Sequence, residues 1–433
     1  MHGIRSVWLL VLLAVALSGG AAAARDIFVA PEVRETGDGS AVRPYATLEQ
    51  AFASGRIEGG DRLILAGGEY GGLTLKNLRF AKPVEITAAQ GATAHFDQIL
   101  IAASSGLILR GLSVWPSRPE PGPTAVVQTL SNASDIVFDR LDVRSTRDAA
   151  GYMSWSRGEW LAVKRGGAFL RGERNTISNS RFTGFYMGIV TTGPDSWIIG
   201  NRVSGFSGDG MRALGDGSLV EGNLVQDCFQ INANHADGFQ SWSRGRNGRA
   251  GGGILRGLSL IGNRIIEWTG PPRHPLRCEL QGIGLFGGMY QDLTIQNNIV
   301  AVRAWHGIAV YGALDTMIVN NTVVNAAGPN RKRPWIGVFD HKNGTPSQRV
   351  VVANNVAMAF VLPADLAHDR RMRNLDIFLP PRHLRAPYEG DFRPLPRGGL
   401  VDAGEMRFAP PRDIEGVRRP QGRAPDLGAY ELH

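Results

Sequence analysis

A short pattern that ends in asparagine recurs along most of the chain and constrains its fold more than any other feature. Each copy is a brief apolar run, alternating as a β-strand does, that leads into an asparagine. The clear copies end at Asn201, Asn223, Asn263, Asn298, Asn321 and Asn355. A weaker copy ends at Asn179, and 201 minus 179 and 223 minus 201 both give 22 residues. Such a period predicts a solenoid of stacked coils, a parallel β-helix.

The recurring asparagines have an architectural role in this prediction. We expect them to line an internal corner of the coils, where each amide can hydrogen-bond the amide above and below it. Asparagine also tolerates the left-handed backbone that a tight corner requires. The fold class predicted is therefore all-β, a single-stranded right-handed parallel β-helix.

The first 24 residues have the features of a secretory signal peptide. Arg5 precedes an apolar run over 7–17, and three alanines at 22–24 provide a small-residue cleavage site. No later apolar run approaches the roughly 18 residues of a membrane span. We expect a protein without a membrane span that is secreted or periplasmic.

The rest of the chain is interpreted as one elongated unit. Residues 25–83 are assigned to an N-terminal cap and first coil, with an amphipathic helix around 46–53 that closes the end of the core. Residues 84–359 are assigned to the β-helix. Residues 360–433, which lose the repeat and are rich in proline and arginine, are assigned to an irregular tail packing on the β-helix. A monomer is expected.

The formal net charge of +8 favours an anionic partner. Many of the basic residues cluster in expected insertions between coils, which favours a bound anion over a merely solubilising surface. These clusters are Arg244, Arg246 and Arg249; Arg273, His274 and Arg277; and Arg331, Lys332 and Arg333. An acidic polysaccharide or oligosaccharide is the expected partner, and nucleic acid is a poor fit to an exported solenoid.

The two cysteines are expected near one corner of adjacent coils. Cys228 lies five residues after Asn223, and Cys278 lies in the insertion after Asn263. In an exported protein a disulfide is plausible, with two reduced, buried thiols as the alternative.

A second recurring strand, starting at a glycine, lies upstream of each asparagine. Alternation places the residue before the glycine and the residue two after it on the outer face. The first external column is predicted to hold Met187, Asp209, Asp237, Gln281, His306 and Ile336. The second is predicted to hold Val190, Arg212, Gln240, Gly284, Ala309 and Phe339.

Polar residues concentrate on two adjacent coils of these columns. Asp209 and Asp237 should stand side by side, flanked by Arg212 and Gln240, with His235 on the same surface. Adjacent carboxylates repel unless they share a cation or a proton, so a purely structural origin is costly. The alternative is that each Asp-Gly pair is only a turn.

Further residues along this face are assigned to substrate binding. They are Gln240, Trp242, Arg244, Gln281, His306, Tyr311, His341 and Lys342. Aromatic rings there can stack on sugars or pack beneath loops. The loops expected at 144–160, 241–256, 266–280 and 324–335 could wall a groove over the polar cluster.

The opening segment 38–70, the coil series and the closing PDLGAYE together resemble the pectate-lyase-like right-handed β-helix superfamily. This scaffold hosts lyases, hydrolases, epimerases, esterases and binding proteins, so the resemblance implies fold more than reaction. Glu159 and Lys164 also resemble, on an expected strand, the calcium-serving Glu and the base Lys of the chondroitinase B and alginate lyase family. The Arg of that family is missing one coil later, so its calcium site is not carried over. Ca²⁺ is the one cofactor that this resemblance suggests.

The leading hypothesis is a polysaccharide lyase that cleaves a uronic-acid-containing polymer by β-elimination. Arg212 would neutralise the substrate carboxylate, and His235, with Lys164 as its rival, would remove the C5 proton. Asp209 and Asp237 would orient His235 or bind a metal cation. The alternatives are a glycoside hydrolase that uses the two aspartates directly, and a β-helix that binds exopolysaccharide without cleaving it.

Overall fold

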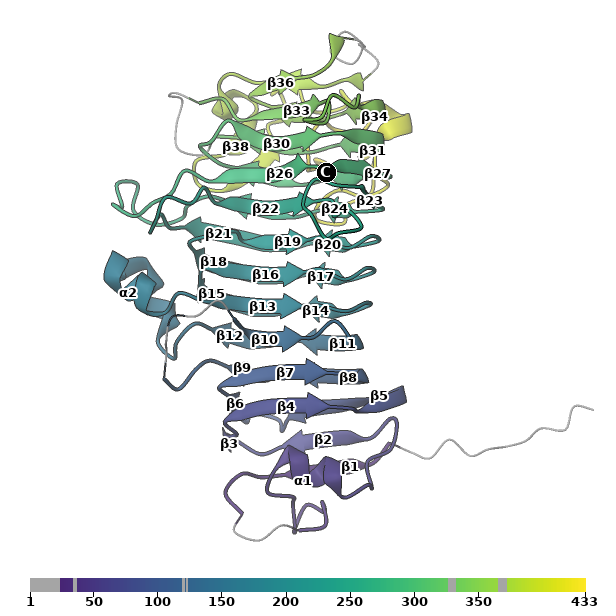
Figure 1. Ribbon diagram of the computed structural model, residues 1–433. Coiled ribbons are helices and arrows are strands. Elements are labelled where there is room, and N and C mark those ends of the chain that lie inside the picture. The colour runs from purple at the N-terminus through teal and green to yellow at the C-terminus, as the bar shows by residue number, and fades with distance from the viewer. Residues whose placement is uncertain (1–23, 34–36, 119–120, 122–123, 326–331, 365–371) are drawn as a thin grey trace, which may run out of the picture.

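The chain winds into a parallel β-helix, seen from the side in Figure 1. The computed structural model describes residues 24–33, 37–118, 121, 124–325, 332–364 and 372–433. Three long sheets, named A, B and C here, hold 14, 12 and 11 strands and run along one axis. Strands of each sheet pair in parallel with the equivalent strand one coil away, so each coil buries its inner face only by stacking.

Sheet A contains β1 (Asp26–Val29), β2 (Arg62–Leu65), β5 (Arg79–Ala88), β8 (Ser105–Arg110), β11 (Ser134–Asp139), β14 (Thr176–Ser178), β17 (Trp197–Ile199), β20 (Leu219–Glu221), β23 (Ile254–Arg256), β24 (Ser259–Ile261), β27 (Met289–Gln291), β28 (Thr294–Gln296), β31 (Ala313–Val319) and β34 (Gln348–Ala353). Sheet B contains β3 (Gly68–Glu69), β6 (Ala94–Phe96), β9 (Ser113–Val114), β12 (Asp142–Arg144), β15 (Arg181–Phe185), β18 (Arg202–Phe206), β21 (Leu224–Cys228), β25 (Arg264–Ile266), β29 (Ile299–Ala301), β32 (Thr322–Val324), β35 (Val356–Ala357) and β37 (Leu375–Asp376). Sheet C contains β4 (Gly72–Lys76), β7 (Gln98–Ala102), β10 (Ala125–Thr129), β13 (Gly166–Leu170), β16 (Met187–Thr191), β19 (Met211–Ala213), β22 (Asp237–Trp242), β26 (Gln281–Gly287), β30 (His306–Tyr311), β33 (Trp335–Phe339) and β36 (Ala359–Val361).

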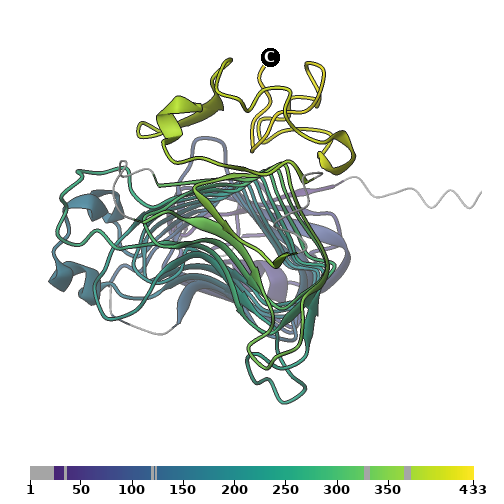
Figure 2. The same cartoon turned by 90° about the horizontal axis from the view of Figure 1, so that it is seen from above.

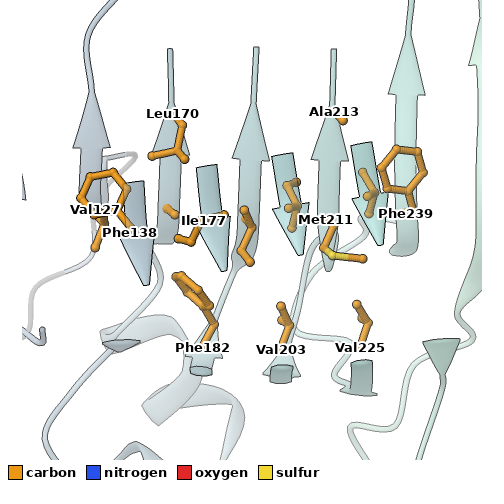
Figure 3. Close-up of a cluster of buried hydrophobic side chains, with 14 of the residues drawn as sticks. Val127, Phe138, Leu170, Ile177, Phe182, Val203, Met211, Ala213, Val225 and Phe239 are labelled. Carbon is orange, nitrogen blue, oxygen red and sulfur yellow. The ribbon is translucent and has the colours of Figure 1, made fainter. Parts of the chain in front are cut away.

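The core is a set of apolar columns inside the coils. Figure 3 shows Phe182, Val203 and Val225 from three successive strands of sheet B in line with one another. All three are fully buried, and strand alternation sends their neighbours outward. The side-chain period of two therefore fixes which residues reach the outer faces.

The recurring asparagines form a continuous amide ladder at the corner between sheets A and B. Asn263 is typical: its Nδ2 donates to the carbonyl of Val220 at 2.8 Å and to Oδ1 of Asn298 at 3.0 Å. Its own Oδ1 accepts from the backbone and side-chain nitrogens of Asn223, at 3.1 and 2.9 Å. The same pattern links Asn201 through to Asn355 and continues to Asn374. The predicted ladder is confirmed.

The left-handed backbone lies one residue earlier than expected. The residues with positive φ are those just before the ladder asparagines, including Gly200 at 65° and Asn297 at 55°. Asn179, expected as a ladder member, occupies this left-handed position at 49°, and Ser180 takes the ladder place beside Asn201. Glycine and asparagine both suit a left-handed backbone. Residue type alone therefore did not distinguish the left-handed position from the ladder position that follows it.

Both ends of the coil stack have their own structures. Helix α1 (Leu48–Ala53), capped by Thr47, covers the N-terminal end with Leu48 and Ala51 buried, as expected. At the other end β36 and β37 continue sheets C and B beyond the boundary placed at residue 359. Asn374 keeps the ladder intact there, although the repeat is no longer visible in the surrounding sequence.

The C-terminal segment packs along one side of the stack, as Figure 2 shows from above. It holds η3 (Pro380–Arg382), the antiparallel pair β38 (Leu384–Ala386) and β39 (Asp391–Pro394), and η4 (Met406–Phe408). Its buried apolar residues, such as Phe392 and Leu427, form a second core with Ile299 and Val324 of sheet B. This segment leaves the outer face of sheet C uncovered.

Two insertions pack together beside the middle coils. One contains η1 (Ala149–Ser154) and α2 (Arg157–Ala162), which project to the left of the stack in Figure 1. Trp160 and Phe229 are the buried centre of an aromatic cluster that includes Trp268 of the other insertion. Cys228 and Cys278 are joined by a disulfide, with their Cα atoms 5.4 Å apart.

None of the helices in the described ranges is long and apolar enough to cross a membrane. The signal peptide expected over residues 1–24 lies, up to residue 23, outside the described residues. Arg331 of the third basic cluster also lies outside them.

Replacing Asn263 by alanine should destabilise the fold by a few kcal/mol. The substitution leaves the buried carbonyl of Val220 and amide of Asn223 without partners, at about 1–3 kcal/mol for each group. Denaturant unfolding measures the effect. The control is Asn247→Ala, in an exposed turn, which should change stability by no more than about 0.5 kcal/mol. Equal stability of the two variants would show that the ladder is not what holds the corner.

Candidate active site

Two columns of residues run along the outer face of sheet C, one position per coil. The first column holds Ala125, Gly166, Met187, Asp209, Asp237, Gln281, His306 and Trp335. The second holds Gln128, Phe169, Val190, Arg212, Gln240, Gly284, Ala309 and Gly337. Both predicted columns are correct from β16 to β30. Ile336 and Phe339 were wrongly placed in them, because an irregularity between His306 and Ile308 shifts the register.

The predicted polar cluster is assembled by this register. Arg212 Nε donates to Asp209 Oδ2 at 2.5 Å, and its Nη2 also pairs with that oxygen. The other oxygen, Asp209 Oδ1, accepts from the backbone amide of Asp237 at 3.0 Å. Gln240 Nε2 donates to Asp237 Oδ2, also at 3.0 Å. The two aspartates are thus neighbours, each with a partner from the second column.

Both carboxyl groups are buried, whereas the sequence placed them on an exposed face. Asp209 is 1 % exposed and Asp237 is fully buried. Burial raises the pKa of Asp209, although the adjacent Arg212 opposes this shift. Burial, helped by the charge of Asp209, raises the pKa of Asp237 to about 8. Strand alternation predicted the direction of these side chains but not the neighbouring groups that cover them.

Hydrogen bonding also supports a protonated Asp237. Its Oδ1 is buried with no partner among the described residues, and the same holds for Oε1 of Gln281, opposite it on the next coil. If Asp237 is protonated on Oδ1, this oxygen becomes a hydrogen-bond donor instead of an unpaired acceptor. The proton also removes the charge repulsion between Asp237 and Asp209. Gly284 is also required here, since a Cβ would lie 2.2 Å from the Phe286 ring and 2.7 Å from Asp237 Oδ1.

His235 is the member of the cluster most open to solvent. It lies just before β22, and its side chain is 67 % exposed. Its Nδ1 is 3.6 Å from Asp237 Oδ2, beyond a direct hydrogen bond but close enough for the carboxyl group to influence it. His306, two coils on, has its pKa lowered by burial and then by the charge of His235. The second imidazole is therefore held neutral near the first.

Aromatic side chains cover sheet C beyond the cluster, over β26, β30 and β33. We call Phe286, His306, Tyr311, Trp335 and Phe339 the aromatic platform. Tyr311 and Phe339 stack with ring centroids 4.5 Å apart, and His306 meets Trp335 edge-on at 4.9 Å. All five are only partly buried. Trp335 was missed from the sequence because the register shift hides its place in the column.

The remaining expected binding residues divide into two groups. Trp242 and Lys342 belong to this face: the Arg212 guanidinium lies 5.0 Å from the Trp242 ring, and Lys342 Nζ lies 5.5 Å from the Tyr311 ring. His341 instead accepts from the Asn343 amide in a turn. Arg244 lies exposed in a hairpin, bridged to Ala250, and is not brought to the polar cluster within the described residues.

Two of the basic clusters contain a cation that is paired with a local acid. Arg277 pairs with Glu267 at 2.9 Å, and Lys332 pairs with Glu279. These cations stabilise the insertions, which weakens the argument that their clustering alone indicates an anionic ligand.

Lys164 is brought to the site differently from the expectation. Glu159 lies in helix α2, not on a strand, and completes a capping box with Ser156. The Ser-x-x-Glu spacing is a helix-start signal that explains the error. Lys164 follows the helix, with Nζ 4.4 Å from the Tyr186 ring. It lines a pocket of about 590 Å³ together with Arg212 and apolar residues of β13 and β16.

The site does not fit a metal ion. No group of three His, Cys, Asp or Glu side chains placed to hold one occurs within the described ranges. Glu159, the calcium-serving residue of the resemblance, has its carboxylate engaged at the helix cap. Asp209 is likewise engaged by Arg212, and Asp237 by Gln240. These residues therefore do not form a Ca²⁺ site.

Residues 156–357 match a family model described as a right handed beta helix region. This match confirms the predicted fold class and, at the level of fold, the resemblance to pectate-lyase-like β-helices. No curated protein matches the chain.

Solved structures similar to this chain include several polysaccharide-active proteins. A pectate lyase, Pel9A, is 16% identical with a TM-score of 0.46, covering 96% of this chain and 98% of its own. A mannuronic acid specific polysaccharide family 6 lyase from human gut microbiota is 13% identical, with a TM-score of 0.43 and coverages of 82% and 91%. A GH136 lacto-N-biosidase from Eubacterium ramulus is 11% identical, with a TM-score of 0.44 and coverages of 78% and 67%. Such low similarities do not identify site residues.

Replacing Asp237 by asparagine should stabilise the protein increasingly as pH rises. Native Asp237, with its pKa near 8, keeps a proton that the unfolded chain releases above about pH 4, so wild-type stability falls between these values, by up to about 1.4 kcal/mol per pH unit. The variant lacks this titration. Unfolding of both proteins at pH 5 and pH 8 measures the difference.

The control for this titration is Asn247→Ala, an exposed substitution that adds and removes no titratable group. Its stability relative to wild type should not change with pH over the same interval. A constant difference between wild type and Asp237→Asn would mean that Asp237 is ionised in the native protein.

Proposed function

We propose that the protein is an exported, monomeric carbohydrate-active enzyme that cleaves a uronic-acid-containing polysaccharide by β-elimination. One observation carries the proposal: the groups of the cluster that reach solvent are an imidazole and a cation, not the carboxylates. His235 is 67 % exposed and Arg212 27 % exposed, while Asp209 and Asp237 lie beneath them. β-Elimination needs those two groups at the substrate.

In the proposed reaction Arg212 binds the uronate carboxylate and stabilises the negative charge that develops as C5 loses its proton. His235 takes this proton, the C5 electron pair forms the C4–C5 double bond, and the C4–O bond breaks. The imidazolium then returns the proton to the leaving oxygen. Asp209 positions Arg212 through their ion pair. Asp237 lies beside His235 and positions the imidazole. Because Asp237 is neutral, it adds no second buried charge next to Asp209.

A glycoside hydrolase is the second candidate, because Asp209 and Asp237 have different environments. One carboxyl group is paired with Arg212 and the other is held protonated, which is the division that acid and base roles require. Against this scheme, neither carboxyl group is exposed to a sugar. The product separates the two reactions, since only elimination leaves an unsaturated uronide that absorbs ultraviolet light.

His235→Ala should lower turnover by at least about a hundredfold. The assay is a screen against alginate, pectate, glucuronan, glycosaminoglycans and bacterial exopolysaccharides, read by ultraviolet absorbance and by reducing ends together. His433→Ala, at the exposed chain end, is the matched control and should keep full activity.

Several results would contradict this scheme. Full activity of His235→Ala with loss of kcat in Lys164→Gln would make Lys164 the base. New reducing ends without ultraviolet absorbance would support the hydrolase, and binding without either product would support a non-catalytic exopolysaccharide-binding protein.

Trp335→Ala should raise KM severalfold on long polymers and leave short oligosaccharides nearly unaffected. Trp335 is part of the aromatic platform, and stacked rings contribute mainly to binding of sugars away from the reacting bond. Trp197→Ala is the control, because Trp197 is exposed on the outer face of sheet A. Equal KM changes on long and short substrates would show that the platform does not bind an extended chain.

A further inference from the structure

The pocket beside the polar cluster has an unusual combination of lining residues. It lies over β10, β13 and β16, on the N-terminal side of Arg212. Its volume of about 590 Å³ is within the range of pockets that enclose small ligands. Because Arg212 belongs both to this pocket and to the cluster, a sugar bound here would adjoin the proposed reacting bond.

The floor of the pocket is apolar because of the coil register. In the outer columns the polar residues of β19 and β22 are replaced by Phe169 and Val190 in one column, and by Gly166 and Met187 in the other. Ala168 also contributes. None of these five floor residues has a side-chain group that can hydrogen-bond a sugar hydroxyl, whereas Tyr186, elsewhere in the lining, has a phenol.

The charge at the rim is positive. Lys164, Arg165 and Arg212 line the pocket, and none of its lining residues is acidic. The Lys164 ammonium lies over the Tyr186 ring at 4.4 Å, and it has no carboxylate partner within the described ranges. This arrangement favours an anionic group beside these cations.

A bare uronosyl residue satisfies only half of this environment. Its carboxylate would pair with the cations, but a ring hydroxyl that lay against Phe169 and Val190 would be buried without a partner, at a cost of roughly 1–3 kcal/mol. An O-acyl ester removes a hydroxyl donor and places a methyl group on the apolar floor. A methyl-esterified carboxyl group would fit the floor but would leave the cations without a charge to bind.

We propose that this pocket is a specificity subsite for an O-acetylated uronosyl residue. This inference rests on the proposed function, which identifies the substrate as a uronic-acid polymer. It adds that the acetyl group is recognised, so acetylated polymer is bound in preference to its de-acetylated parent. Lys164 in this assignment binds the carboxylate and is not the base.

The test measures binding and cleavage separately. Alginate, pectate and glucuronan are each chemically O-acetylated to a matched degree and compared with the untreated parent, by calorimetric Kd and by ultraviolet absorbance. The expected result is a Kd about tenfold lower for at least one acetylated polymer, as burial of one small apolar group gives. Val190→Asn should reduce this preference to below about twofold, because its amide gives the parent's hydroxyl a hydrogen-bond partner and so lowers the Kd for the parent.

Val351→Asn is the matched control, because Val351 is partly buried on the outer face of sheet A. It should keep the full preference. Equal Kd for acetylated and parent polymers, or a preference that survives in Val190→Asn, would overturn the subsite. Preferential binding of acetylated polymer without cleavage would uphold the subsite and refute the lyase reaction. Cleavage without a preference for acetylated polymer would uphold the lyase reaction and refute the subsite.

Discussion

The hydrogen-bonded ladder at the corner between sheets A and B is the interaction on which the rest of the molecule depends. Each asparagine amide donates to the asparagine of the next coil and accepts from that of the preceding coil, so a slip of one residue would leave several buried polar groups unpaired. Apolar columns alone would tolerate a shift between similar side chains. The amides do not, and they therefore fix the register of every strand that follows the corner.

This register is what brings Asp209 and Asp237 together. A fixed spacing of about 4.8 Å between coils makes two separated sequence positions neighbours on sheet C. Burial, and secondly the charge of Asp209, disfavour the ionised form of Asp237 by on the order of 6 kcal/mol relative to a carboxyl group in water, given the shift of its pKa from 3.8 to about 8. The ladder supplies a scaffold stiff enough to hold such a pair, which a flexible loop would separate.

Features that follow from the coil repeat and the strand alternation could be predicted from the sequence. Features that depend on local departures from that repeat could not. The coil series, the capping helix near Leu48, and the pairing of Asp209 with Asp237 all follow from spacing. Ser180 was missed because Asn179, beside it, also suits a left-handed corner. Trp335 was missed, and Ile336 put in its place, because of a register irregularity that no residue type indicates. The burial of Asp237 could not be predicted, since it depends on side chains contributed by several coils.

The outer face of sheet C changes character along the axis in a way that only stacking can produce. Apolar residues with cations at their rim lie over β13 and β16, the polar cluster lies over β19 and β22, and the aromatic platform lies over β26 to β33. A ligand that touches all three parts must extend along the axis, across strands rather than parallel to them. The cations Lys164 and Arg212 lie at the apolar end, whereas the rings, with Lys342 beside them, lie at the other end. The two ends of such a ligand would therefore meet chemically different surfaces.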